Sequence, residues 1–387
     1  MEQPFIYEKY VTGKQFLSRR NSTVILSNLL SHGENVAIYA PPKSGKMSLL
    51  QQTLYEMRTS SRRYVTATVD LLGIRSSKDF LTTLGDSVIR AFATTPQEYS
   101  AIVRTYLSGS HFVFDQRAYS ESDRIVSLNW DLDEEDTLAM LRLPYYLAED
   151  KDIQLYIILT EFQNIEFFEE SHRILKMLES VIKESREQLQ KPMCSFVMIG
   201  SKVNAMKDIF EHRKLFWKTV ERFKPCQIEE KDVIEHVVKG LLSSGKVVDK
   251  ELIISIYKLF KGDIWYINHF VSICDHLSKG YIMEPVLLEA LDRIISIHEP
   301  RFHSMVNDLT TFQLNLLRAI IDGNTQLSGA GIIADYALNS AANVKRLKDA
   351  LTKKEIITFD ERDCPVILDP LFEFWLKKYF FHKKTDF

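Results

Sequence analysis

Short and almost uninterrupted apolar runs recur through the first half of the chain, and segments with helical periodicity separate them. The runs cover residues 35–39, 64–70, 153–159 and 194–199. Strands that are buried on both faces read as continuous apolar runs, whereas strands with one face in water alternate between apolar and polar residues. Because helices predicted over 79–93 and 169–189 separate these runs, the pattern favours a parallel sheet covered by helices on both sides.

Residues 95–150 interrupt this rhythm of strands and helices. Two β-like stretches, 112–114 and 125–128, are separated by polar turn residues, and a longer helical pattern follows them. We predict an insertion that consists of a hairpin and a helix.

The second half of the chain begins as a series of helical patterns, which predicts a small helical lid domain. These patterns cover residues 231–243, 249–260, 263–278 and 284–297. We predict a linker at His298-Glu299-Pro300, because a proline interrupts most helices. The last part of the chain has three helical patterns and two strands, at 310–321, 329–336, 340–353, 355–359 and 366–368. Three helices before a two-stranded wing are typical of a winged helix.

A candidate phosphate-binding loop lies between the first apolar run and the helical pattern that follows it. The loop consists of Ala40, Pro41, Pro42, Lys43, Ser44, Gly45, Lys46 and Met47. Such a loop needs backbone N–H groups that point inward and a helix N-terminus whose dipole faces the anion. Gly45 permits the tight backbone, and the Lys46 ammonium is placed to contact the β- and γ-phosphates of a nucleotide. The order strand, loop, helix is the context that this motif requires.

The residues expected to bind magnesium depart from the usual pattern of phosphate loops. The residue after the loop lysine normally offers a hydroxyl to Mg²⁺, but here it is Met47. Ser48 is adjacent, yet on a helix its side chain points about 100° away. The apolar strand 153–159 should end in an aspartate that holds Mg²⁺, and that position is Thr160. No magnesium ligand is therefore assigned, and Ser48, Thr160 and Asp70, the last residue of another strand, are kept as candidates.

A carboxylate remains beside this altered metal position. Glu161 directly follows Thr160, where an acidic side chain would polarise an attacking water. The sequence therefore keeps one element of hydrolysis while the usual oxygen ligands of the metal are missing.

Several further motifs stand along the chain in a recognisable order. They are Phe16-Leu17-Ser18-Arg19, Ile157 to Gln163, Gly200-Ser201, Gly262-Asp263-Ile264-Trp265-Tyr266, and Asp369-Pro370-Leu371-Phe372 with Trp375-Leu376. With Ala40 to Leu50 as the Walker A motif, they resemble the N-terminal box, Walker B strand, sensor 1, lid element and winged-helix ending of the prokaryotic AAA+ ATPases of the archaeal-type ATPase family. This family is allied to the STAND and origin-initiator branches, and the resemblance covers nearly the whole chain. The chain departs from the family pattern at Met47 and Thr160.

The resemblance implies an α/β protein that binds ATP or ADP. A P-loop AAA+ domain is expected over 1–226, with its insertion at about 95–150, followed by a helical lid domain over 227–298 and a winged helix over 299–387. The resemblance places Arg19 beside the nucleotide base, Glu161 at the attacking water and Ser201 at the γ-phosphate. In such proteins a basic residue after sensor 1 acts as an arginine finger, and the candidates here are Arg213, Lys214, Lys218 and Arg222.

Charge restricts the partners that the chain can bind through a general electrostatic field. The formal net charge is −3, so no global positive field attracts nucleic acid or an anionic membrane. Duplex DNA would have to meet a local basic face, for which Lys345, Arg346 and Lys348 on the predicted helix 340–353 are the candidates. The N-terminus lacks the layout of a signal peptide and no segment is apolar enough to span a bilayer, so we expect a cytoplasmic location without membrane contact.

Three functional hypotheses follow from these observations. The first is an ATP-binding switch with slow or absent hydrolysis, whose nucleotide state sets the orientation of the winged helix for an unidentified protein client. The second is an active Mg²⁺-dependent ATPase that recruits Ser48, Asp70 or Thr160, and the third is a DNA-binding regulator or initiator with the P-loop domain as scaffold. An oligomer is compatible with each of them.

Overall fold

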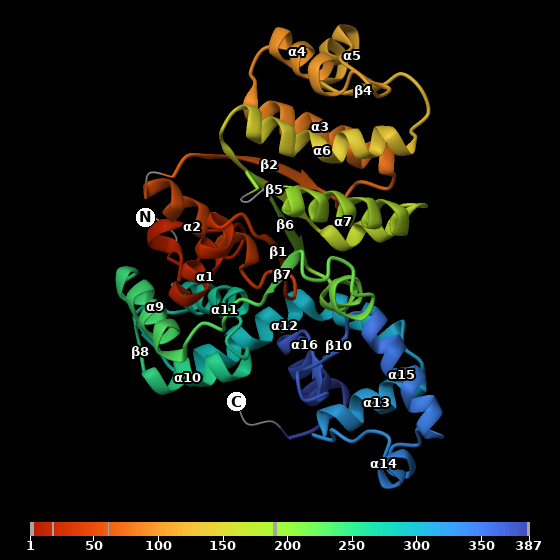
Figure 1. The fold of residues 1–387 in the computed structure, drawn as a ribbon. Helices are drawn as coiled ribbons and strands as arrows, with labels where there is room; N and C mark the ends of the chain where they lie inside the picture. Colours follow the sequence, from red (N-terminus) through yellow and green to blue (C-terminus); the bar gives the residue numbers. More distant parts are fainter. Residues whose placement is uncertain (1–3, 18, 61, 189–191, 385–387) are drawn as a thin grey trace. The chain divides into compact units, whose positions relative to one another are not determined.

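The computed structural model describes residues 4–17, 19–60, 62–188 and 192–384 (Figure 1). Ser18 of the predicted N-terminal box and residue 189, the predicted end of a helix, lie outside the described residues. The chain forms two compact units. The sheet unit comprises Arg20–Ala40 and Leu50–Pro225, and the helical unit comprises Met1–Arg19, Pro41–Leu49 and Cys226–Phe387. The domain boundaries expected from the sequence stay a prediction.

The sheet unit is built on five parallel strands in the order β2-β5-β6-β1-β7. Their bounds are β1 Asn35–Tyr39, β2 Tyr64–Asp70, β5 Gln154–Thr160, β6 Cys194–Gly200 and β7 Val220–Phe223. All seven residues of β6 are buried, as expected for a central strand with both faces covered. The predicted parallel sheet and its first four strands are confirmed. The sequence did not reveal β7, because this edge strand is short and two of its four residues are exposed charges.

Helices pack against the sheet and continue into the insertion. In chain order they are α1 Arg20–Ser31, α2 Lys46–Thr59 from Leu50 onward, α3 Ser77–Phe92, α4 Pro96–Tyr106, α5 Gln116–Ser122, α6 Glu134–Asp150, α7 Ser171–Gln188 and α8 Val203–Lys207. Two strands of the insertion, β3 Phe112–Val113 and β4 Ser127–Leu128, pair antiparallel as predicted. The helix α5 connects them, so the insertion holds more helix than the hairpin and single helix predicted from the sequence.

The helical unit contains a group of four helices and a winged helix. The first group consists of α9 Glu230–Ser243, α10 Lys250–Leu259, α11 Ile264–Leu277 and α12 Glu284–Asn307, with β8 Val247–Val248 paired parallel to β9 Tyr281–Ile282. The winged helix follows as α13 Thr311–Ile321, α14 Ala330–Asp335, α15 Ala341–Lys353, β10 Ile357–Phe359, β11 Pro365–Ile367 and α16 Pro370–Trp375. Its antiparallel wing pairs Ile357 with Ile367. The predicted helices and wing are confirmed.

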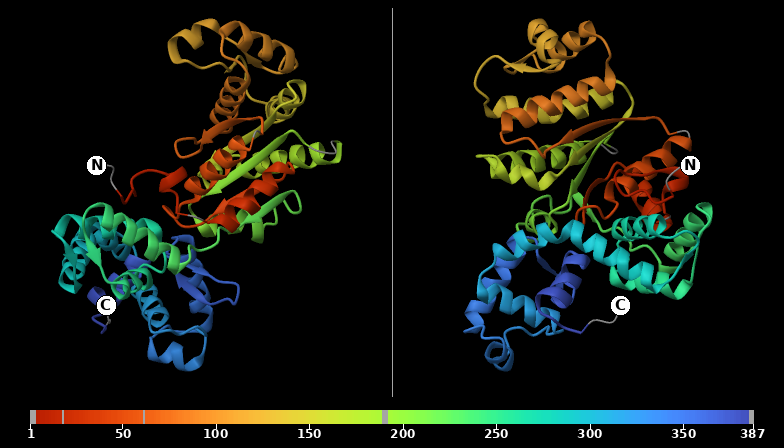
Figure 2. Two further views of the ribbon diagram at one scale, coloured as in Figure 1. Left: turned by 90° about the vertical axis from the view of Figure 1, so that its left-hand side faces the viewer. Right: turned by 180° about the vertical axis from the view of Figure 1, so that it is seen from behind.

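The linker predicted at His298-Glu299-Pro300 is wrong, because these residues lie inside the 24-residue helix α12. Figure 2 shows α12 running without interruption from the first helices of this unit toward the winged helix. A proline removes one backbone hydrogen bond and strains the preceding turn. Here the helix continues because apolar residues on either side of Pro300, including Ile294 and Phe302, are fully buried. Among the described residues, no helix has the length and apolar character needed to cross a membrane.

Candidate functional site

The candidate phosphate-binding loop has the tight backbone that the sequence predicts at Gly45. It follows β1 and leads into helix α2, Lys46–Thr59. Lys43 and Gly45 have positive φ angles of 64° and 81°, a conformation that glycine adopts freely and other residues rarely adopt. The N–H of Leu49 donates to the carbonyl of Gly45 over 2.9 Å, so helical hydrogen bonding begins at the end of the loop.

Lys46 curls back over this loop. Its side chain is buried, and its Nζ donates to the Pro41 carbonyl over 2.7 Å and to Ser44 Oγ over 3.3 Å. The ammonium group therefore lies against the loop, where it donates to two oxygen acceptors of the loop itself. A phosphate there would replace neutral acceptors with a charged one, which forms a stronger hydrogen bond.

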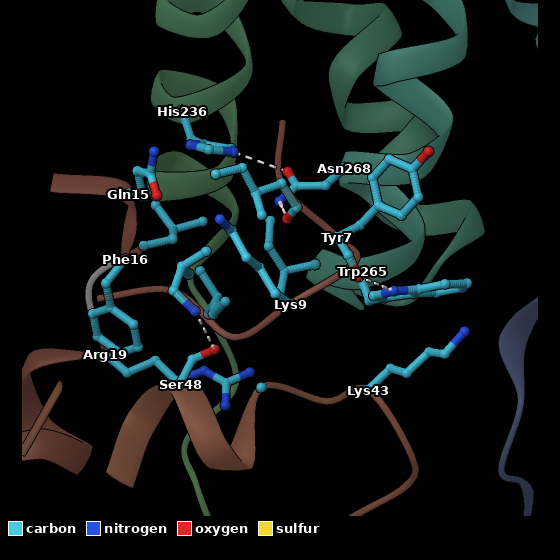
Figure 3. A pocket seen from close by; sticks show the side chains of 16 residues that line it. Tyr7, Lys9, Gln15, Phe16, Arg19, Lys43, Ser48, His236, Trp265 and Asn268 are labelled. Carbon is cyan, nitrogen blue, oxygen red and sulfur yellow. Dashed lines mark hydrogen bonds between the residues drawn. The ribbon is translucent and has the colours of Figure 1, made fainter. Parts of the chain in front are cut away.

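A pocket of about 70 Å³ lies beside the loop within the helical unit (Figure 3). Its wall is formed by the N-terminal segment, the loop and the start of α2, and helices α9 and α11. The lining side chains labelled in Figure 3 are Tyr7, Lys9, Gln15, Phe16, Arg19, Lys43, Ser48, His236, Trp265 and Asn268. Sequence reasoning found Arg19, Phe16, Ser48, Lys43 and Trp265. It missed the others, because no local motif marks them.

The N-terminal segment lies across this pocket and is held by three side chains. Val11 donates its N–H to Ser48 Oγ over 3.1 Å, Trp265 Nε1 donates to the Tyr7 carbonyl over 2.6 Å, and Asn268 Nδ2 donates to the Ile6 carbonyl over 3.0 Å. We call residues 5–11 the N-terminal strap. The hydroxyl of Ser48, a candidate metal ligand, thus serves to position the strap.

Two cations face the pocket from different sides. Lys43 Nζ lies 3.6 Å from the centroid of the Trp265 ring, which is a cation–π contact between the loop and α11. Arg19 lines the same pocket, and burial lowers its pKa while the nearby Asp263 acts in the opposite direction. Asp263 caps α11 by accepting from the N–H groups of Trp265 and Tyr266.

The remaining predicted catalytic and metal residues gather at the carboxyl ends of the strands of the sheet unit. Strands β2 and β5 pair so that Asp70 lies opposite Thr160, and Thr160 Oγ1 donates to Asp70 Oδ1 over 3.0 Å. Glu161 Oε2 accepts from Ser201 Oγ over 2.5 Å and from Gln163 Nε2 over 2.6 Å. The structure therefore brings together Asp70 with Thr160, and Glu161 with Ser201.

The four candidate arginine-finger residues differ in their surroundings. Arg213 forms ion pairs of 2.8 Å with Glu166 and with Asp208, so its charge is balanced within the sheet unit. Arg222 lies on β7 with its guanidinium 6.0 Å from the exposed Trp217 ring. Lys214 and Lys218 both have positive φ angles, 55° and 63°. Which of them faces a phosphate stays a prediction.

A second set of potential metal ligands lies in the insertion. His111, Asp133 and Asp136 bring one ligand atom each within 4.8 Å of one another. The Asp136 carboxylate, however, accepts from the N–H of Asp133 in the capping box of α6, and it also accepts from the N–H of His111. We assign this cluster to the helix cap, which a carboxylate satisfies without a metal.

The basic residues of the winged helix lie on α15. Lys345 and Arg346 are exposed, and Lys348 Nζ lies 5.0 Å from the Phe359 ring of the wing. Neither Lys345 nor Arg346 forms an ion pair within the described part of the chain. The α15 face is therefore basic and open at these two positions.

Comparison with known proteins shows which folds this architecture is similar to. Residues 300–378 match the family described as "Probable winged helix domain", and no curated protein matches the chain. The Walker-type ATPase PABY2304 of Pyrococcus abyssi is similar over 96% of this chain and 99% of its own, with a TM-score of 0.63 and 14% identity. The ORC2 protein of Aeropyrum pernix, solved as ADPNP–ADP complexes, is similar over 96% of this chain and 94% of its own, with a TM-score of 0.58 and 12% identity. The chain therefore has an AAA+-like α/β fold with a five-stranded parallel sheet, a helical region and a C-terminal winged helix.

Proposed function

We propose that this protein binds an adenine nucleotide and acts as a nucleotide-dependent switch, with hydrolysis slow or lost. The observation that carries the proposal is the phosphate loop, in which the buried Lys46 ammonium lies against a backbone with positive φ angles at Lys43 and Gly45. Such a loop presents backbone N–H groups and a fixed cation to an anion. The fold likeness to a protein solved with ADPNP and ADP supports the same ligand class.

The pocket beside the loop supplies a place for the base. It joins the aromatic rings of Tyr7 and Trp265 to the polar side chains of Arg19 and Asn268, a combination that suits a planar ring with polar edges. Its volume of about 70 Å³ leaves little room, so we expect the N-terminal strap to move when nucleotide enters. That movement would shift α11, because Trp265 of this helix is hydrogen-bonded to the Tyr7 carbonyl of the strap.

The proposed weakness of hydrolysis follows from the oxygen atoms around the loop. Met47 offers no oxygen to Mg²⁺, which prefers carboxylate and hydroxyl ligands. Ser48 Oγ accepts from Val11, and Thr160 gives its hydroxyl proton to Asp70. The usual ligand set of a phosphate-loop ATPase is thus replaced by groups that already serve the fold, and we derive no step through a bound metal.

Calorimetric titration with ATP and with ADP, each with and without Mg²⁺, tests this proposal. We expect binding that is largely independent of Mg²⁺ and that weakens about tenfold or more in Lys46→Ala, because a hydrogen bond to a charged acceptor contributes about 1.5–3 kcal/mol. Lys279→Ala, which removes one positive charge from an exposed position of the helical unit, is the control. Absence of binding by the wild type, or equal affinity in Lys46→Ala, would refute it.

An active Mg²⁺-dependent ATPase is the second candidate, and the pairing of Asp70 with Thr160 favours it. This contact places a carboxylate next to the position where an aspartate normally holds Mg²⁺. Asp70 with Thr160 would then hold the metal, which would neutralise phosphate charge, and Glu161 would orient water. Phosphate release that requires Mg²⁺ and disappears in Glu161→Gln would support this function, whereas rates equal to those of buffer would exclude it.

DNA binding through the winged helix is the third candidate, favoured by the exposed Lys345 and Arg346 on α15. In winged helices this helix is the one that enters the major groove. A salt-dependent shift of duplex DNA that weakens in Lys345→Ala with Arg346→Ala is the expected result. Absence of a shift at low salt would exclude this function.

A further inference from the structure

A groove lies at the amino ends of the strands in the sheet unit, away from the carboxylates at the strands' carboxyl ends. It has a volume of about 690 Å³, within the range of about 300–1,000 Å³ typical of small-ligand sites. Its lining comprises Ser31, His32, Arg62, Arg63, Tyr64, Asp152, Gln154, Tyr156 and Met193. Parallel pairing explains this set, because the amino ends of β1, β2, β5 and β6 all meet at one edge of the sheet. Strand β5 alone separates this edge from Glu161 by roughly 20 Å.

Two arginines that are consecutive in the sequence supply the positive charge of the groove. Arg62 and Arg63 are both exposed, and neither forms an ion pair or a side-chain hydrogen bond within the described residues. Arg58 adds a third cation close by, with its guanidinium 5.1 Å from the Tyr64 ring. The planar guanidinium matches the oxygen geometry of a phosphate group and binds it through paired N–H donors.

The floor of the groove is rigid and aromatic. Tyr64 and Tyr156 lie with ring centroids 5.3 Å apart. Their hydroxyls donate to main-chain carbonyls, from Tyr64 to Leu54 over 2.5 Å and from Tyr156 to Leu30 over 3.3 Å. Burial raises the pKa of both phenols, so they stay neutral and protonated. The site therefore exists before any ligand enters, which lowers the entropic cost of binding.

Hydrogen-bond acceptors stand beside the arginines. Ser31 Oγ donates its proton to the Ser27 carbonyl, which leaves its oxygen lone pairs for a ligand donor. His32 Nδ1 donates to the Asn28 carbonyl over 2.7 Å, which leaves Nε2 to face a ligand. Asp152 contributes a carboxylate that forms no ion pair within the described residues. Donors for phosphate and acceptors for hydroxyl groups thus line one cavity.

We propose that this groove is a second ligand site, distinct from the phosphate loop, and that it binds a sugar phosphate through Arg62 and Arg63, with Asp152, His32 and Ser31 accepting from the sugar hydroxyls. The same chemistry is present in a small phosphorylated sugar and in the backbone of RNA. The two sources differ in how many phosphates they offer and therefore in the salt dependence of binding.

Calorimetric titration of the full chain with ribose 5-phosphate, and separately with a short oligoribonucleotide, tests the proposal. Both titrations use the Lys46→Ala background, so that the phosphate loop contributes little to the signal. We expect the change Arg62→Ala with Arg63→Ala to weaken binding about tenfold to a hundredfold, because the loss of one charge-assisted hydrogen bond costs about tenfold in affinity and the loss of two costs about a hundredfold. The change Lys78→Ala with Arg104→Ala removes the same charge from exposed positions of the sheet unit outside the groove and should leave the affinity unchanged.

Asp152→Asn should strengthen binding rather than weaken it when the probe is inorganic phosphate. Asparagine tolerates the left-handed backbone that Asp152 adopts, with φ of 49°. Removing its negative charge should strengthen the binding of inorganic phosphate, since only the repulsion of the anion is lost.

The outcomes separate the possibilities. Tighter and more salt-dependent binding of the oligoribonucleotide supports the proposal with RNA as the source, and preference for ribose 5-phosphate supports it with a small molecule as the source. Affinity for both probes that is equal in the arginine variant, its control and the parent protein would overturn it.

Discussion

Replacing Thr160 by aspartate restores the residue that normally holds Mg²⁺ in phosphate-loop ATPases, and the structure determines what this change should cost. Thr160 Oγ1 donates to Asp70 Oδ1 over 3.0 Å, and the pairing of β2 with β5 fixes the two residues opposite each other. In Thr160→Asp the hydroxyl donor becomes a carboxylate. A hydrogen bond is thereby replaced by a contact between two negative charges.

The size of the effect follows from these distances. Loss of the hydrogen bond costs about 1 kcal/mol. Two unit charges about 4 Å apart repel by about 1 kcal/mol in water and by about 4 kcal/mol near a protein surface. Because Asp70 is exposed, the lower part of this range applies, and the free energy that opens this edge of the sheet should fall by about 2–3 kcal/mol in total.

Amide hydrogen exchange of peptides from β2 and β5 measures this change directly. Without divalent cations, we expect exchange in Thr160→Asp to be faster than in the wild type by a factor of about 30 to 150, which is the same free energy written as a ratio. Mg²⁺ should restore much of the protection, because a hard cation between two carboxylates removes their repulsion. Thr160→Asn, which adds an amide of similar size and no charge, is the control.

The result that would refute this reasoning is equal exchange in Thr160→Asp and Thr160→Asn in the absence of metal. It would show that Asp70 and residue 160 are not in contact in solution. Protection of Thr160→Asp that Mg²⁺ leaves unchanged would show that the pair of carboxylates does not hold the cation, and it would weaken the case for an active ATPase.

Two further predictions concern the insertion and the N-terminal strap. Asp86 accepts from the N–H groups of Ile125 and Val126, and burial raises its pKa from 3.8 to about 6. The folded state therefore holds this proton more tightly than the unfolded chain, so stability is lost as the pH rises from 3.8 to about 6. Asp86→Asn should remove this loss of stability, which hydrogen exchange over 112–128 measures. The same pH dependence in the variant and in the wild type would contradict the prediction. Gly240→Ala places a Cβ 2.5 Å from the ring of Phe5, which is 1% exposed. Overpacking of about 1–3 kcal/mol should accelerate exchange in the strap, whereas Gly331→Ala, with open space at its Cβ, should not.

Much of the secondary structure could be predicted because its signals are local. Strands β1, β5 and β6 are mostly apolar and the edge strand β2 is rich in β-branched residues, and the amphipathic helices of the winged helix show their period directly. The edge strand β7 was not predicted from the sequence, because it has only four residues and two of them are exposed charges. The helix end expected at Pro300 was wrong, because the burial of apolar residues along α12 outweighs one missing hydrogen bond.

Some features of the candidate site could likewise be predicted from the sequence, and others could not. By itself the sequence determined where the candidate phosphate loop lies, since Gly45 and Lys46 are consecutive residues of one motif, and it placed Met47 and Thr160 at the two positions where oxygen ligands of Mg²⁺ are expected. It also placed Glu161 and Ser201 at the ends of strands.

Only the tertiary structure decided which side chains meet. Strand order makes Asp70 the partner of Thr160, although 90 residues separate them. The fold of the N-terminal strap engages the Ser48 hydroxyl, and the packing of α11 brings Trp265 under Lys43. The groove around Arg62 likewise exists because parallel strands bring their amino ends to one edge. The spacing of apolar residues along a segment indicates which of its faces contact the core and which contact water. Contacts between distant segments depend instead on strand order and helix packing, which no local pattern specifies.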